Sequence, residues 1–222
     1  MQIKINPDLF FVFDLDDTLF SEIEFLRSGY RHISEKISNV TQQDIYNEML
    51  RRYDDNENVF QWITETFGEK NQEITKEFLL KEYREHYPII SLDRGAERFL
   101  EQVNEAGIPC GLITDGRSVT QRNKLKALNI LGVFDEVIIS EEFGSEKPSL
   151  KNYQVFENKY PGREFYFFGD NTSKDFVVPL QLGWVTVCLR NPGTNIHKQD
   201  FLNFPQPQYV ISSFEEIQLV HS

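Results

Sequence analysis

The segment LFFVFDLDDT at residues 9–18 joins five consecutive apolar residues to a turn that carries three aspartates. An uninterrupted apolar run of this length is typical of a central strand that is covered on both faces of a sheet. The residues that follow such a strand lie at its carboxyl end, where open parallel sheets bind their ligands. The segment therefore predicts a buried strand at residues 9–13 and a candidate site directly after it.

Similar apolar runs recur further along the chain, and helical patterns separate them. The additional strands that we predict are Ile108–Thr114, Glu136–Ser140, Glu164–Gly169, Trp184–Leu189 and Gln208–Ile211, and the helices are Gly95–Ala106, Ser118–Leu128, Ser149–Tyr160 and Ser173–Leu182. Strands that alternate with helices imply βαβ units and a parallel sheet. The predicted fold is therefore α/β, with a Rossmann-like parallel sheet flanked by helices.

This alternation is interrupted after the first strand. Between Ser21 and about Tyr87 the sequence shows amphipathic helical patterns and no strand pattern. The predicted helices are Glu22–Ser38, Gln42–Tyr53, Val59–Phe67 and Ile74–Tyr87, with Thr41 and Asn58 as candidate N-caps. The sequence thus predicts an all-helical insert within an α/β core.

Charge and composition limit the kinds of partner that the protein is expected to bind. The 222 residues carry a formal net charge of −12, and phosphate contacts in nucleic acid or anionic lipid would require clustered Lys and Arg. We therefore expect neither nucleic acid nor a membrane as a partner. Cys110 and Cys188 lie in apolar runs and are predicted to be buried strand residues. We find no signal-peptide pattern and no apolar run near the ~20 residues of a membrane span, so we expect a cytoplasmic protein.

Polar groups follow four of the predicted strands. They are Asp14-Leu15-Asp16-Asp17-Thr18, then Thr114-Asp115-Gly116, then Ser140 with Lys147-Pro148, and finally Gly169-Asp170-Asn171 with Asp175. Each group alone is common in solvated turns. Because the carboxyl ends of parallel strands meet at one edge of a sheet, the coincidence of all four indicates a site there.

In order and spacing, these groups resemble the four motifs of the haloacid dehalogenase-like hydrolase superfamily. Asp14-Leu15-Asp16-Asp17-Thr18 is similar to its DxDx[TV] motif, Thr114 to the second motif, Lys147 to the third, and Gly169-Asp170 with Asp175 to the fourth, GDxxxxD. The resemblance covers the whole chain, because the superfamily places a helical cap after the first motif. It implies a Rossmann-like core of residues 1–19 and 89–222 and a helical cap of residues 20–88.

We predict from these residues a phosphatase that hydrolyses a small phosphorylated metabolite. Carboxylates form acyl phosphates in aspartyl-phosphate enzymes, so Asp14 is the predicted nucleophile. The resemblance implies that Asp16 protonates the leaving oxygen and then activates water. Carboxylates close to a phosphate require a cation, and Mg²⁺ favours oxygen ligands. By resemblance, its ligands are the Asp14 carboxylate, the Asp16 carbonyl and the Asp170 carboxylate, while Asp175 supports the metal shell or orients Lys147.

The phosphate is expected to lie beside the second motif. The Thr114 hydroxyl and the amides of Asp115 and Gly116 precede the helix at Ser118, whose N-terminus favours an anion. Lys147 is predicted to supply positive charge to the phosphate and to Asp14.

Other residues are open to two interpretations. Phe20, Glu22, Arg27, Tyr30 and Arg31 are candidates for recognising the leaving group, but packing explains Phe20 and Phe25 about as well. Arg117 is a candidate substrate contact or an exposed charge. Ser140 and Glu142 are candidates for shaping the approach to Lys147, and Ser140 fits a turn equally well. Trp62 and Trp184 are predicted core residues.

Three rival functions share the scaffold. A 2-haloacid dehalogenase uses the same aspartate nucleophile, but it has no leaving oxygen for Asp16 to protonate. A phosphomutase keeps every motif and differs mainly in closure and water control. A non-catalytic metabolite-binding protein would usually have lost the nucleophile or the lysine, whereas Asp14 and Lys147 are both present. The sequence is compatible with a monomer or a homodimer.

Overall fold

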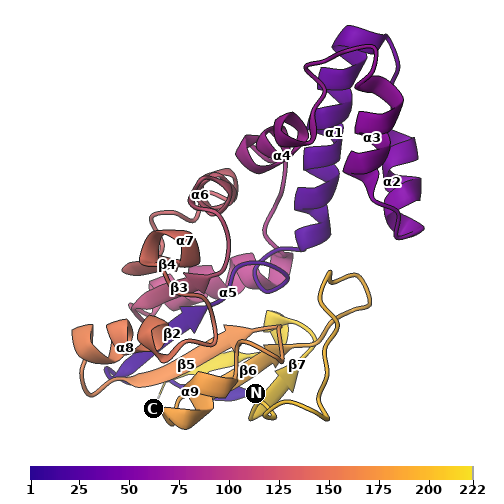
Figure 1. The fold of residues 1–222 in the computed structure, drawn as a ribbon. Helices are drawn as coiled ribbons and strands as arrows, with labels where there is room; N and C mark the ends of the chain where they lie inside the picture. The colour runs from indigo at the N-terminus through magenta and orange to yellow at the C-terminus, as the bar shows by residue number, and fades with distance from the viewer. Residues whose placement is uncertain (222) are drawn as a thin grey trace. The chain divides into compact units, whose positions relative to one another are not determined.

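The computed structural model describes residues 1–221 and contains two compact units (Figure 1). The first unit comprises Met1–Ile23 and Ser91–Ser222, and the second comprises Glu24–Ile90. Within residues 1–221, the first unit holds all the strands, whereas the second is built from helices. Each unit is described by itself below.

The main sheet of the first unit is six-stranded and parallel, in the order β4-β3-β2-β5-β6-β7. Its strands are β2 (Leu9–Phe13), β3 (Cys110–Thr114), β4 (Glu136–Ile139), β5 (Glu164–Gly169), β6 (Val185–Leu189) and β7 (Tyr209–Ile211). The segment that decided the prediction, β2, lies between β3 and β5, and all five of its residues are buried. The predicted α/β fold is confirmed.

Helices cover both faces of this sheet. The side chains of β2 alternate in direction, so they pack against a helix on each face. Phe11 and Phe13 contact Phe99 of α5 (Arg94–Glu105), with ring centroids 5.9 and 6.3 Å apart. Phe10 points the other way and contacts Phe156 of α8 (Leu150–Lys159) at 5.8 Å. Each fully buried Phe stabilises the fold by about 2 kcal/mol. A run that is apolar on both faces is therefore required at this position.

The remaining helices of this unit are α6 (Ser118–Ala127), α7 (Ser140–Phe143) and α9 (Val177–Gln181), with a 3₁₀ turn at Phe214–Glu216. Two of the predicted boundaries that the structure corrects lie near the candidate site. The strand predicted to reach Ser140 ends at Ile139, and Ser140 instead begins α7. The helix predicted from Ser173 begins only at Val177, because the preceding turn is held by the side chain of Asp175.

A second, two-stranded parallel sheet joins β1 (Gln2–Lys4) to β8 (Gln218–Val220). The sequence analysis did not predict either strand. Cys110, Cys188 and Trp184 are buried, as predicted. Among the residues that the structure describes, we find no helix with the length and apolar character needed to cross a membrane.

The helical unit consists of α1 (Glu22–Thr41), whose first two residues belong to the first unit, α2 (Tyr46–Asp54), α3 (Val59–Phe67) and α4 (Lys76–Glu85). Asn58 caps α3 by accepting a hydrogen bond from the Gln61 amide, as predicted. The prediction that Thr41 is an N-cap is wrong: α1 continues to Thr41, whose hydroxyl bonds to the carbonyl of Ile37. Trp62 is only half-buried and lies beneath the guanidinium of Arg52.

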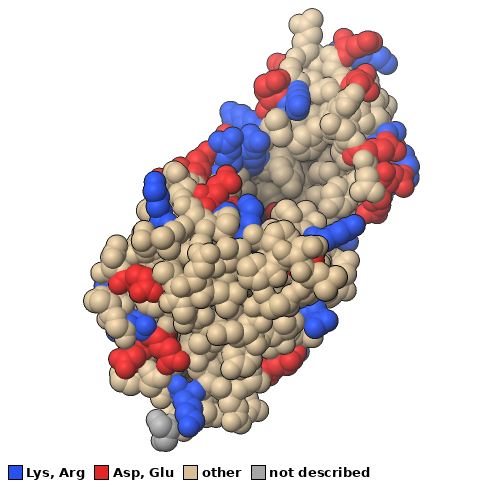
Figure 2. All heavy atoms as spheres, turned by 60° about the horizontal axis from the view of Figure 1, so that its bottom comes forward, with Lys and Arg blue, Asp and Glu red and all other residues tan. Residues whose placement is uncertain are grey.

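Charged side chains of both signs are interspersed on the face drawn in Figure 2. In the helical unit, Arg51 pairs with Glu48 and Asp55 on the exposed side of α2. Exposed pairs of this kind contribute about 0–1 kcal/mol each. They keep the surface polar, and the stability of each unit comes mainly from its apolar core.

Candidate active site

Asp14 follows β2 directly, and its backbone is held by the neighbouring strand. The Asp14 amide donates a hydrogen bond to the carbonyl of Phe168 in β5, with an N···O distance of 2.8 Å. The Asp14 side chain is buried. Because this hydrogen bond ties its backbone to β5, the carboxylate has a defined position at the sheet edge.

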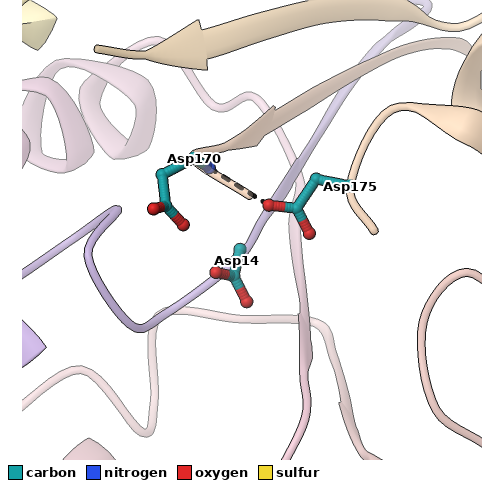
Figure 3. A group of neighbouring side chains, drawn as sticks. All are labelled: Asp14, Asp170 and Asp175. Carbon is teal, nitrogen blue, oxygen red and sulfur yellow. Dashed lines mark hydrogen bonds between the residues drawn. The ribbon is translucent and has the colours of Figure 1, made fainter. Parts of the chain in front are cut away.

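Asp170 and Asp175 approach Asp14 from the end of β5 (Figure 3). One ligand oxygen of each carboxylate lies within 4.8 Å of the others. Asp175 Oδ2 accepts hydrogen bonds from the amides of Asp170 and Asn171 at 3.1 and 2.8 Å, which closes the turn. A Cβ atom at Gly169 would meet Asp175 Oδ2 at 2.5 Å, so glycine is required there for this close approach. The GDxxxxD spacing therefore has a direct steric reason.

Lys147 places its ammonium group between two of these carboxylates. Its Nζ donates to Asp14 Oδ1 at 2.5 Å and to Asp175 Oδ1 at 2.7 Å, and its side chain is 4% exposed. The Lys147 amide donates to Asp115 Oδ1 at 3.0 Å. Lys174 Nζ donates to the other oxygen of Asp115 at 2.8 Å. Asp115 thus fixes the segment that carries Lys147.

The charge of the cluster is not balanced by Lys147 alone. Burial, together with the charges of Asp175 and Asp16, raises the pKa of Asp14 to about 7, although Lys147 opposes the shift. Burial and the nearby Asp175 and Asp14 raise the pKa of Asp170 to about 9. For Lys147, the charges of Asp14 and Asp175 outweigh burial and hold its pKa well above the usual value. The set consists of carboxylate oxygens only, which suits a hard divalent cation such as Mg²⁺.

These pKa shifts predict a falling stability of the metal-free protein with rising pH. The folded pKa of Asp170 lies above that of an unfolded aspartate, about 3.9, so the folded state binds the proton more tightly. The resulting contribution of Asp170 to the free energy of unfolding is complete below about pH 4. It is lost as the pH rises through about 9. In EDTA, we expect Asp170→Asn to melt at least about 3 °C above the wild type near pH 8, with a smaller difference near pH 5. An asparagine variant that melts lower than the wild type at both pH values would contradict this account.

The predicted phosphate-binding residues lie at the end of β3. Thr114 is buried, and its hydroxyl oxygen accepts a hydrogen bond from Gln121 Nε2 at 2.5 Å. The Gly116 amide donates to Ser140 Oγ at 2.9 Å. In this structure the Gly116 amide is therefore already hydrogen-bonded to Ser140. The phosphate contacts of Thr114, Asp115 and Gly116 remain predictions.

Asp16 is engaged by two side chains of α6 that the sequence analysis did not single out. Lys124 Nζ donates to Asp16 Oδ1 at 2.6 Å, and Gln121 Nε2 donates to Asp16 Oδ2 at 2.9 Å. Both donors are buried. The sequence placed Gln121 and Lys124 within a predicted helix. It did not indicate that they face inward, because the buried face of this helix is mostly polar and shows no apolar pattern.

The loop after β6 supplies further contacts that sequence reasoning missed. Asn195 Nδ2 donates to Asp170 Oδ2 at 2.9 Å, and Gln199 Nε2 donates to the Asp170 carbonyl at 2.8 Å. The Ile196 amide donates to Asp17 Oδ2 at 3.0 Å. Because this loop has no periodic pattern, the sequence did not indicate which of its residues reach the sheet edge.

A single pocket brings the acidic and basic groups together within the first unit. It is lined by Asp14, Asp16, Glu22, Asp115, Lys147, Asp170, Asn171, Lys174 and His197. Six of the eight predicted site residues line this pocket or belong to the carboxylate cluster, namely Asp14, Asp16, Asp115, Lys147, Asp170 and Asp175. Thr114 joins them through Gln121, whereas Gly116 faces Ser140.

The structure separates the other sequence candidates into residues that line the pocket and residues that are packed or paired elsewhere. Glu22 lines the pocket, and burial together with the charge of Asp16 raises its pKa to about 8. Phe20 and Tyr30 are buried, which favours the packing interpretation for Phe20. Arg117 is exposed and pairs with Glu141, as expected of a surface charge. Glu142 is engaged by Arg122 and by the Ser118 hydroxyl.

Comparison with known proteins identifies the class to which this fold and site belong. The family model described as haloacid dehalogenase-like hydrolase matches residues 11–184, so the chain belongs to this family of hydrolases. The resemblance inferred from the four motifs is confirmed, and so is the prediction that the chain is an enzyme, a hydrolase.

Similar proteins cover nearly the whole chain. The glyceraldehyde 3-phosphate phosphatase of Methanocaldococcus jannaschii is 25% identical over 218 residues, which is 93% of each chain. The protein of the same name from Methanopyrus kandleri is 27% identical over 202 residues, 81% of this chain and 82% of that one. The structure of YfnB from Bacillus subtilis, bound to magnesium, superposes with a TM-score of 0.66 at 20% identity, and the match covers 93% of this chain and 95% of that one. This last similarity supports the fold.

Proposed function

We propose that the protein is a Mg²⁺-dependent phosphatase that hydrolyses the phosphate monoester of a small metabolite through an aspartyl-phosphate intermediate. The observation that carries the proposal is the buried cluster of Asp14, Asp170 and Asp175 with Lys147 between two of its members. The phosphatase names of the curated relatives support it. The first substrate to test is glyceraldehyde 3-phosphate, because two of these relatives carry its name.

In the first step, the Asp14 carboxylate attacks phosphorus. Lys147 holds Asp14 Oδ1, which fixes the rotation of the carboxylate and places a positive charge beside the oxygens that gain negative charge. As the bond between Asp14 and phosphorus forms, the ester P–O bond breaks, and Asp16 gives a proton to the leaving oxygen. The products of this step are the free alcohol and an acyl phosphate on Asp14.

In the second step, Asp16 takes a proton from water while the water oxygen attacks phosphorus. The bond from phosphorus to Asp14 breaks, inorganic phosphate leaves, and both aspartates return to their starting states. Asp14, Asp170 and the Asp16 carbonyl are the proposed holders of Mg²⁺, with Asp175 supporting them. When bound, Mg²⁺ would neutralise phosphate oxygens that the carboxylates otherwise repel.

Chelation is expected to silence the enzyme. EDTA should reduce phosphate release to background, and added Mg²⁺ should restore it. Because Asp14 and Asp170 have pKa values of about 7 and about 9, they must lose protons to bind the ion. The apparent Mg²⁺ affinity should therefore rise from about pH 6 to about pH 9. Full activity in excess chelator would contradict the metal assignment.

The experiment that tests the function is a phosphate-release screen over phosphorylated metabolites, ranked by kcat/KM. We expect phosphate release from at least one substrate and no halide release from a 2-haloacid. Halide release without Mg²⁺ would favour a dehalogenase, and isomer formation without free phosphate would favour a phosphomutase. Binding without turnover would indicate a non-catalytic protein.

We also propose that the helical unit acts as a cap of residues 20–88 on a core of residues 1–19 and 89–222. A cytoplasmic location and a monomeric or homodimeric state remain part of the proposal, with a small phosphorylated metabolite as the partner and neither nucleic acid nor membrane. Sedimentation of the purified protein with and without Mg²⁺ measures the oligomeric state directly.

A further inference from the structure

The inner face of α6 is polar where a helix packed on a core is usually apolar. Its buried residues are Thr120, Gln121, Lys124 and Leu125. Lys124 is 3% exposed and Gln121 is 1% exposed. Burying an ammonium or an amide costs free energy unless it is paired. The contacts that these two side chains make should therefore explain their position.

Both side chains donate a hydrogen bond to the Asp16 side chain. Lys124 Nζ donates to Oδ1 at 2.6 Å, whereas Gln121 Nε2 donates to Oδ2 at 2.9 Å. The two donors are three residues apart on one helix, so they share a face. An aspartate has only two side-chain torsions, and one donor on each oxygen fixes its carboxyl plane. The Asp16 side chain remains 18% exposed and lines the pocket.

Gln121 also links Asp16 to the predicted phosphate site. The same Nε2 atom donates to Thr114 Oγ1 at 2.5 Å. Because the hydroxyl oxygen of Thr114 accepts this bond, its own hydrogen is available to donate elsewhere. One amide group thus sets the orientation of a carboxylate that follows β2 and of a hydroxyl on the last residue of β3.

We propose that Gln121 and Lys124 are positioning residues that hold Asp16 in the orientation from which it protonates the leaving oxygen. This inference rests on the proposed phosphatase function. In the step concerned, the ester P–O bond breaks, its electron pair stays on the leaving oxygen, and that oxygen takes the proton of Asp16. Stability alone does not account for the arrangement, since a buried ion pair is often no better than apolar packing.

The test compares two substrates that differ in their need for the acid. An aryl phosphate with an acidic phenol leaves without protonation, whereas an alkyl phosphate requires it. We expect Lys124→Met and Gln121→Leu to lower kcat/KM for the alkyl phosphate by about 10²-fold, and for the aryl phosphate by less than about 10-fold. The ratio kcat/KM is chosen because it reports events up to formation of the phosphorylated enzyme and excludes its hydrolysis.

Two controls accompany this comparison. Lys126→Met changes an exposed lysine on the same helix and should behave as the wild type with both substrates. In an Asp16→Asn background, Lys124→Met should cause little further loss with the alkyl phosphate, because the group that it positions is gone. If Lys124→Met fails to fold in a thermal melt, Gln121→Leu carries the same comparison, because it removes a neutral group.

Equal losses with both substrates, or rates equal to or above the wild type, would overturn the inference while leaving the proposed function in place. A wild-type protein that releases phosphate from neither substrate would overturn the proposed function, and this inference with it. The two failures are therefore distinguishable in one set of measurements.

Discussion

Replacing Asp14 by asparagine is expected to lower kcat for phosphate release by at least about 10⁴-fold. The amide oxygen of asparagine is a poor nucleophile, so the acyl phosphate cannot form at useful rates. Asparagine has nearly the same shape as aspartate, and the backbone of residue 14 is held by the Phe168 carbonyl. The far-ultraviolet circular dichroism of the variant should therefore match that of the wild type.

Steady-state kinetics with the best substrate of the screen measure this effect. The matched control is Asp8→Asn, which changes an exposed aspartate just before β2 and should retain the wild-type rate. An Asp14→Asn variant that keeps the wild-type kcat would remove Asp14 from the mechanism, and with it the aspartyl-phosphate pathway.

Replacing Lys147 by methionine is expected to harm both catalysis and stability. Loss of one positive group beside the transferring phosphoryl typically costs about 10²–10³-fold in kcat. The variant also leaves Asp14 and Asp175 buried without their shared ammonium group. Removing one partner from a buried pair costs about 3–5 kcal/mol of unfolding free energy.

Urea unfolding in EDTA near pH 8 measures the stability effect, and phosphate release in Mg²⁺ measures the catalytic one. The stability loss should shrink at lower pH, because a protonated carboxyl no longer needs a cation. Lys151→Met is the control, since Lys151 is exposed on α8. A Lys147→Met variant with wild-type stability near pH 8 would show that the cluster does not depend on this ammonium group.

The sequence predicted the central strands β2 and β3 well because they are buried on both faces. The run at residues 9–13 is apolar and buried throughout, and β5 contributes three buried phenylalanines, Phe165, Phe167 and Phe168, a pattern that is typical of a strand inside a covered parallel sheet. Turn chemistry also carried information, since Gly169 and the spacing to Asp175 are linked by a steric contact. The convergence of Asp14, Asp170 and Asp175 follows from parallel strands that end at one edge.

Contacts made by isolated polar side chains could not be predicted. Gln121 and Lys124 lie on a predicted helix, but its buried face is polar, so apolar periodicity gives no register. Asn195 belongs to a loop without regular structure, and its contact with Asp170 spans 25 residues. The pairing of β1 with β8 joins three-residue strands from opposite ends of the chain, too short for a period-two pattern.

The most direct test of the central claim is to identify the phosphorylated residue. Wild-type protein is mixed with excess substrate and Mg²⁺, quenched in acid within one turnover, digested and analysed by tandem mass spectrometry. We expect one phosphate on Asp14 of the wild type and none on the Asp14→Asn variant. Phosphate on another residue, or turnover with no phosphorylated protein at any quench time, would contradict the account.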